Sequence, residues 1–143
     1  MPSDPPRDAQ GRIVPHDHPE IADDSFVIRH INPREVHDGC VSSGAYTESK
    51  EGGMSVDVEI WMFADGLQQL HYVSEAEGAR RIRVGELRAE GMLVGWDPDS
   101  GHTHHGAVWR VPTSRSGRRK VHRMTTLIKL AQGELPPTSQ PDE

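Results

Sequence analysis

The sequence predicts an α+β protein with a small mixed or antiparallel sheet, short helices and a C-terminal amphipathic helix. Two observations lead to this class. Short runs of β-forming residues are interspersed with short helical patterns, without the regular strand–helix alternation of a parallel α/β fold. The 143 residues also include 14 Gly and 11 Pro, which indicates many turns between short elements.

A single folded domain is predicted over residues 25–133, since domains of about 100–150 residues are the commonest. Residues 1–24 hold five Pro and six acidic residues against two Arg, and residues 134–143 have a similar composition. Such segments have few large apolar side chains to bury. Both are therefore predicted to be disordered tails.

The first elements follow from β propensity and turn residues. Residues 26–31, FVIRHI, are predicted to form a strand that stops at an Asn-Pro pair. Pro33 can then open a turn or short helix that lasts to residue 36. Asp38-Gly39 is a turn signal, and residues 40–46 are predicted to be extended.

The middle of the chain contains one ambiguous segment. Residues 54–62, MSVDVEIWM, alternate in polarity, which favours a half-buried strand, while a helix over residues 56–70 is the competing interpretation. Further on, Ser74 and Glu77 fit a capping box for a short helical turn that ends near Gly78.

A strand, a helix and a second strand are predicted next. Ile82 and Val84 suit a brief strand. Residues 85–90 are predicted to form one or two helical turns closed by Gly91, which tolerates a left-handed cap. Residues 92–96, MLVGW, are predicted to form the second strand.

The last predicted elements are a loop, a strand and a helix. Residues 97–101, DPDSG, carry a turn signature. Residues 104–111 form a predicted strand with one mostly apolar face. Residues 121–132 have apolar side chains at helical spacing, and Gly133 caps the predicted amphipathic helix.

Composition excludes several classes of protein. The chain has one cysteine, so Cys40 has no intrachain disulfide partner, and a Cys-rich zinc module would need at least two thiolates. No apolar run approaches the roughly 20 residues of a membrane span, and the N-terminus lacks the apolar core of a secretion signal. We therefore expect a cytoplasmic protein without membrane association.

Several short motifs occur in one order along most of residues 24–133. They are Arg29, Ser42-Ser43-Gly44-Ala45-Tyr46, Met54-Ser55-Val56-Asp57, Leu87-Arg88, Gly91, Asp97-Pro98 and a His-x-x-Val pattern from His105 to Val108. In this set the chain resembles a group of short uncharacterised bacterial proteins, some of them encoded near mobile or defence loci. The resemblance brings no named fold or activity. The positions that it marks for attention are Arg29, Ser42, Ser43, Ser55 and His105.

The largest local group of potentially catalytic side chains is a histidine cluster that follows the loop of residues 97–101. If strand geometry begins by His102, then His102 and His104 point the same way and His105 points to the core. Such a pair could act as general acid and base on a phosphodiester. It could instead hold zinc together with a carboxylate or Cys40. A structural role, in which the histidines cap backbone groups, is a third interpretation.

An arginine and two serines suggest an anion site. Arg29, Ser42 and Ser43 combine a rigid donor fork with hydroxyl groups, which suits phosphate. Their arrangement is similar in kind to that of ADP-ribosyltransferases, although the spacing is shorter and no catalytic Glu stands out. The structural alternative pairs Arg29 with Asp57 or Glu59 across neighbouring strands.

Positive charge is concentrated late in an otherwise acidic chain of formal net charge −6. The basic segment has seven Lys+Arg and no acid: Arg110, Arg115, Arg118, Arg119, Lys120, Arg123 and Lys129. Such a segment can bind the phosphates of a nucleic acid without recognising its base sequence. A solvated charged loop is the simpler alternative.

These signals together favour a small intracellular protein that acts on or binds a nucleotide or nucleic-acid phosphate. His104 and His102 would be base and acid, and the phosphate would be bound by a set of arginines, serines and a lysine: Arg29, Ser42, Ser43, Arg110, Arg118, Arg119 and Lys120. No cofactor is required by this interpretation. The alternatives are a non-catalytic protein-interaction or accessory module of a bacterial defence or mobile-element system, and a small His-ligated metalloprotein, for which zinc is one possible ion. Nucleophilic catalysis by Cys40, near His37 in sequence, is a further hypothesis.

Overall fold

The computed structural model describes residues 2–37, 40–50, 52–67, 79–100 and 102–128. The strands are β1 Phe26–His30, β2 Val36–His37, β3 Cys40–Val41, β4 Met54–Val58, β5 Ala79–Arg83, β6 Leu93–Trp96, β7 His105–Trp109 and β8 Thr125–Ile128. The helices are α1 Glu59–Ala64, α2 Val84–Ala89 and α3 Arg115–Met124, with 3₁₀ turns η1 Pro33–Glu35, η2 Ser43–Ala45 and η3 Pro98–Ser100. The predicted α+β class is confirmed.

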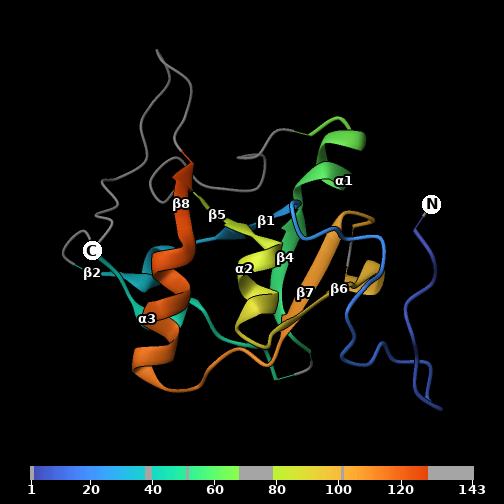
Figure 1. Ribbon diagram of the computed structural model, residues 1–143, viewed down its shortest axis with the longest axis horizontal. Coiled ribbons are helices and arrows are strands. Elements are labelled where there is room, and N and C mark those ends of the chain that lie inside the picture. The colour runs from blue at the N-terminus through green and yellow to red at the C-terminus, as the bar shows by residue number, and fades with distance from the viewer. Residues whose placement is uncertain (1, 38–39, 51, 68–78, 101, 129–143) are drawn as a thin grey trace.

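Within these described residues, six strands form one sheet in the order β6-β7-β4-β1-β5-β8, and β2 pairs with β3 separately. Every neighbouring pair in the sheet is antiparallel. The strands β4 and β1 are central. Figure 1 shows α2 lying across the sheet, α3 beside the β2–β3 hairpin, and α1 at the opposite side of the molecule from α3.

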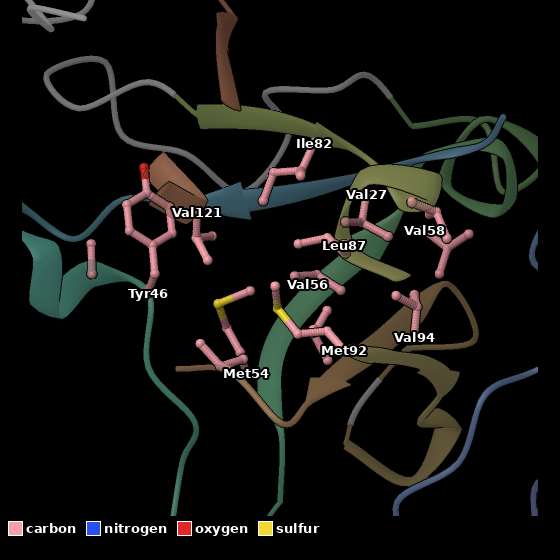
Figure 2. Packing of buried hydrophobic residues seen from close by; sticks show 14 of the residues in the cluster. Val27, Tyr46, Met54, Val56, Val58, Ile82, Leu87, Met92, Val94 and Val121 are labelled. Carbon is pink, nitrogen blue, oxygen red and sulfur yellow. The ribbon is translucent and has the colours of Figure 1, made fainter. Parts of the chain in front are cut away.

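The main core lies on one face of the sheet, as the alternation in β4 predicts. Met54, Val56 and Val58 are at most 2% exposed, and they pack in one cluster with Leu87 of α2 and Val121 of α3. Figure 2 shows these side chains converging between the strands and the two helices. Each such buried side chain stabilises the fold by about 1.5–3 kcal/mol. The intervening residues of β4 point to the opposite face, which is more polar.

The ambiguous segment after residue 54 contains both predicted elements. The strand β4 ends at Val58, and α1 begins at Glu59, so the strand predicted to residue 62 is too long and the helix predicted from residue 56 begins too early. Glu59 lies in the first turn, where a helix dipole favours negative charge. Both of its carboxylate oxygens accept hydrogen bonds from Arg81 of β5 (2.7 Å each), which fixes the helix start against the sheet.

The predicted C-terminal helix is displaced along the chain. It was expected over residues 121–132, whereas α3 begins and ends earlier and is followed by β8. The helix begins early because the hydroxyl of Ser114 accepts a hydrogen bond from the backbone N–H of Gly117 (3.1 Å), an N-cap. It ends at the pair of threonines that begins with Thr125, since β-branched side chains favour strands. The predicted helix from residue 129 onward lies outside the described residues.

The N-terminal segment, predicted as a disordered tail, packs against β6 and α2 instead. Arg88 of α2 forms ion pairs with Asp17 and Asp23 (2.8 Å each). The ring of His16 accepts a hydrogen bond from the backbone N–H of Trp96 (3.1 Å), and His18 is 1% exposed. Polar contacts hold much of this segment, together with Ile21, which is 2% exposed in the main core. The low apolar content of residues 1–24 did not reveal these contacts. Residues 134–143 lie outside the described part of the chain.

The remaining predictions divide between confirmed, corrected and undescribed segments. The helix closed by Gly91 is confirmed, and that glycine has a φ of 89°. Residues 40–46, predicted as extended, form the short strand β3 and then the turn η2. The predicted turns at 38–39 and 74–78 lie outside the described residues. Among the helices of the described chain, none combines the length and apolar character that crossing a bilayer demands.

Candidate functional site

A pocket between the β2–β3 hairpin, η2 and α3 gathers part of the predicted anion-binding set. Its volume is about 330 Å³, and its lining includes Ser42 and Ser43. The full lining, which we call the basic pocket, is His37, Cys40, Val41, Ser42, Ser43, Arg115 and Arg119. Two guanidinium groups, an imidazole and two hydroxyls belong to the lining, and none of its described residues carries a carboxylate. The chemistry of the pocket is therefore suited to an anion.

Arg115 and Arg119 enter the pocket together because of helix geometry. Residues four apart lie on the same face of an α-helix, and α3 presents both arginines toward η2, on which it packs. The position of the helix depends on the cap at Ser114. Because the helix was predicted to start at residue 121, its two pocket-lining arginines appeared to belong to a loop.

His37 and Cys40 reach the pocket from the hairpin. They are directly opposite each other in the antiparallel β2–β3 pairing, so their side chains lie on the same side of the hairpin. Cys40 is exposed.

Ser42 also holds its own turn in place. Its hydroxyl accepts a hydrogen bond from the backbone N–H of Gly44 (3.2 Å) and caps η2. The turn ends at the fully buried Tyr46, which anchors this edge of the pocket in the core.

Arg29 supports the pocket wall from behind and is not part of the lining. Its guanidinium donates to the backbone carbonyl oxygens of Ala45 (3.0 Å) and Ser55 (2.8 Å). Burial lowers the pKa of Arg29 from its usual value. The arginine therefore links η2 to β4. Its expected structural partners bind elsewhere, Asp57 to His30 and Glu59 to Arg81.

Three other residues of the basic segment lie outside the basic pocket. Lys120 forms an ion pair with Glu90 of α2 (2.8 Å). Arg118 donates to the carbonyl oxygen of Pro112 (3.1 Å) and to the hydroxyl of Thr47 (3.0 Å). Arg110 is exposed and has a φ of 65°. None of these three side chains lines the basic pocket.

The predicted acid–base histidines lie in a second cluster, beside α1. His102 and His104 do point the same way, since their rings stack with centroids 5.0 Å apart and an interplanar angle of 8°. His104 is 2% exposed. It donates through Nδ1 to a carboxylate oxygen of Asp65 (2.7 Å), and its Nε2 lies 3.9 Å from a carboxylate oxygen of Asp57.

The carboxylates around His104 extend the cluster further. Asp57 also accepts a hydrogen bond from Nε2 of His30 (2.8 Å). The hydrogen bond from His104, helped by one from the hydroxyl of Thr103, lowers the pKa of Asp65. Asp57 and Asp65 were not predicted as part of this site. They are distant in sequence from the histidines, and only the β4–β7 pairing and the end of α1 bring them close.

The basic pocket and the His104 cluster are separate. The pocket adjoins α3, whereas the His104 cluster adjoins the end of α1, and these helices lie at opposite sides of the molecule (Figure 1). His105, expected to face the core, is partly buried on the polar face of the sheet, and His104 is the buried residue. The residues predicted to bind phosphate and the predicted acid–base pair therefore do not share a pocket.

A metal site has no support in the described part of the chain, where no three His, Cys, Asp or Glu side chains group in a way that could hold an ion. Comparison with protein-family models, with curated proteins and with solved structures gave no match to this chain. The function is therefore argued from the geometry of the pockets.

Proposed function

We propose that this intracellular protein binds the phosphate group of a nucleotide in the basic pocket. The observation that supports the proposal is the presence of Arg115, Arg119 and two serine hydroxyls around one space of about 330 Å³. Guanidinium groups bind phosphate oxygens through paired N–H donors, and hydroxyl groups complete the oxygen shell. Ligand sites commonly have volumes of about 300–1,000 Å³, so a pocket near the lower end of that range has room for a phosphate group and part of a nucleoside.

A small ligand fits the charge distribution better than a long nucleic acid. A track for a polymer needs a continuous row of cations, but Arg118 donates to Pro112 and Thr47, and Lys120 pairs with Glu90 and lines a different pocket. Arg115 and Arg119 are the two cations that line the basic pocket among the described residues. The proposal therefore concerns a compact site.

The proposed activity is binding, without hydrolysis at this pocket. His102 and His104 are in the other cluster, so their predicted roles as acid and base have no substrate to act on here. His37 is the imidazole that belongs to the lining. At neutral pH an imidazole can donate a hydrogen bond to a phosphate oxygen.

Titration calorimetry with ADP, AMP and inorganic phosphate tests the proposal. A charged hydrogen-bonding partner is worth about 1.5–3 kcal/mol, so Arg115→Ala and Arg119→Ala should each raise Kd by about tenfold or more. Arg123→Ala is the matched control, because Arg123 is an exposed arginine of the same helix outside the pocket lining. Binding that is lost equally in all three variants would indicate general charge attraction and contradict a built site.

A short single-stranded oligonucleotide gives the second arm of the experiment. If the oligonucleotide binds more tightly than ADP, and the binding is weakened as much by Arg123→Ala as by Arg119→Ala, the ligand is a nucleic acid on an open surface. If only the nucleotides bind, and only the pocket variants weaken them, the proposal holds.

A further inference from the structure

Three side chains of the types used in acyl transfer lie close together on the polar face of the sheet, and none of them lines the basic pocket. They are Ser55 of β4, His105 of β7 and Asp97, which follows β6. In the β4–β7 register Ser55 is opposite Ala107 and Asp57 is opposite His105, so Ser55 and His105 are diagonal neighbours on one face. The strands β6, β7 and β4 are adjacent in the sheet.

Two hydrogen bonds fix the ring of His105, one with the hydroxyl of Ser55 and one with the backbone of Asp97. The hydroxyl oxygen of Ser55 lies 2.5 Å from Nε2 of His105. On the other side of the ring, Nδ1 lies 3.2 Å from the backbone carbonyl oxygen of Asp97 and 3.6 Å from its carboxylate. A carbonyl oxygen can only accept, so Nδ1 carries the proton. Nε2 is then the acceptor, and the hydroxyl of Ser55 donates to it.

Of the three side chains, Ser55 is the most accessible to solvent. The side chains of His105 and Asp97 are 13% and 20% exposed, and Ser55 is exposed at the surface. In a serine nucleophile of this kind, an accessible hydroxyl contacts an imidazole, and a carboxylate lies on the far side of that imidazole. Ser55, His105 and Asp97 follow the same order. The partly buried imidazole is held from its far side, and the hydroxyl can meet a substrate.

We propose that Ser55 is the nucleophile of a second site that cleaves carboxylic esters, with His105 as general base and Asp97 as its positioning residue. The hydroxyl oxygen of Ser55 bonds to the ester carbonyl carbon as its proton passes to Nε2 of His105. The C–O bond to the alcohol then breaks, and the alcohol leaves with that proton. Water next attacks the acyl carbon and gives a proton to Nε2, the bond to Ser55 breaks, and Ser55 recovers the proton as the carboxylic acid leaves.

The surrounding charge selects the class of ester. Asp97 belongs to the site, and Asp57, 5% exposed, is opposite His105 on the next strand. Both carboxylates disfavour an anionic substrate. Neutral or cationic esters are therefore expected. This site shares no residue with the lining of the basic pocket, so the variants of the two sites are distinct and either proposal can fail while the other holds.

Covalent labelling tests the nucleophile directly. A fluorophosphonate probe reacts with activated serines, and peptide mass spectrometry should find its adduct on Ser55. Labelling should be absent in Ser55→Ala and reduced about 100-fold or more in His105→Gln, because general-base catalysis contributes at least that factor. Ser116→Ala is the control, since Ser116 is an exposed serine of α3. An unlabelled Ser55, or equal labelling in the His105 variant, would overturn the proposal.

Hydrolysis of p-nitrophenyl acetate tests the positioning role. Asp97→Asn should lower kcat by about tenfold or more with KM unchanged, because it removes the carboxylate that stabilises the charged imidazole. A loss of structure alone would move the melting temperature, which is measured on the same samples. If Ser55→Ala hydrolyses the ester as fast as the unaltered protein does, the site is not catalytic.

Discussion

The hydroxyl of Tyr46 and Nδ1 of His122 are joined by a hydrogen bond of 2.7 Å in the interior of the protein. Tyr46 is fully buried and His122 is 2% exposed. Tyr46 ends the turn that carries the pocket serines, and His122 belongs to α3, which carries the pocket arginines. This one polar contact therefore ties together the two walls of the basic pocket.

Removal of the hydroxyl should destabilise the fold. Tyr46→Phe keeps the ring in the core but deprives a buried imidazole of this hydrogen bond, which costs about 1–3 kcal/mol of unfolding free energy. Urea denaturation measures the change. In a double-mutant cycle with His122→Asn, the two losses should be less than additive. Fully additive losses would mean that the two side chains do not interact in solution.

The same tyrosine predicts a loss of stability at alkaline pH. Burial raises the pKa of Tyr46 from 10.0 to about 12. Below pH 10 both the folded and the unfolded chain keep the phenolic proton. Between pH 10 and 12 the unfolded chain loses it first, so the unfolding free energy falls. The free energy should fall less steeply over this range in Tyr46→Phe, as urea titrations at several pH values would show. Parallel curves would contradict the assignment.

Much of the fold could be predicted because its core elements carry local patterns. The alternation in β4 identifies the residues of one buried face, and the turn residue Gly91 ends α2 where expected. The C-terminal region could not be placed correctly, because apolar spacing at residues 124–131 satisfies a helical pattern, while β-branched residues from Thr125 favour pairing with β5. Competition for a sheet edge is a tertiary effect that no local pattern records.

In the candidate sites, too, some features follow from local sequence and others depend on the tertiary fold. The i,i+4 spacing of Arg115 and Arg119 was available in the sequence, although it has meaning only when the helix is known to start at the Ser114 cap. The pairing of His37 with Cys40 was not predicted, although the two residues flank an Asp-Gly turn signal. By contrast, the partners of His104 depend on strand order, which the sequence does not reveal. Residues 50 positions apart, such as Ser55 and His105, meet only because β4 and β7 are neighbours.

Acidification should weaken the attachment of the N-terminal segment. Nδ1 of His16 donates to the carbonyl oxygen of Val14 (2.8 Å), and Nε2 accepts from the backbone N–H of Trp96 (3.1 Å). Burial lowers the pKa of His16 below its usual value of 6.5. Stability is therefore fully present above pH 6.5 and declines as pH falls toward the lower value in the folded state, because the unfolded chain binds the proton first.

Thermal unfolding between pH 7.5 and 5.5 would measure this decline. In His16→Gln the side-chain amide carries no titrating group, so its melting temperature should change less over the same range. The ring of His16 lies 5.2 Å from that of Trp109, and tryptophan fluorescence reports the local change. An unchanged pH dependence in the variant would assign the effect to another group.

Arg110 offers a test of backbone strain just after β7. Its φ of 65° lies in the left-handed region, where a side chain other than glycine costs about 1–2 kcal/mol. Its side chain is exposed, so little packing is lost on removal. Arg110→Gly relieves the strain but gives the unfolded chain more freedom, and the net gain should be about 0.5–1 kcal/mol. Arg110→Ala retains a Cβ atom and removes the same charge, so it should not be stabilised. Chemical denaturation distinguishes the two: an equal gain in both variants would show that charge relief, rather than backbone geometry, governs this position.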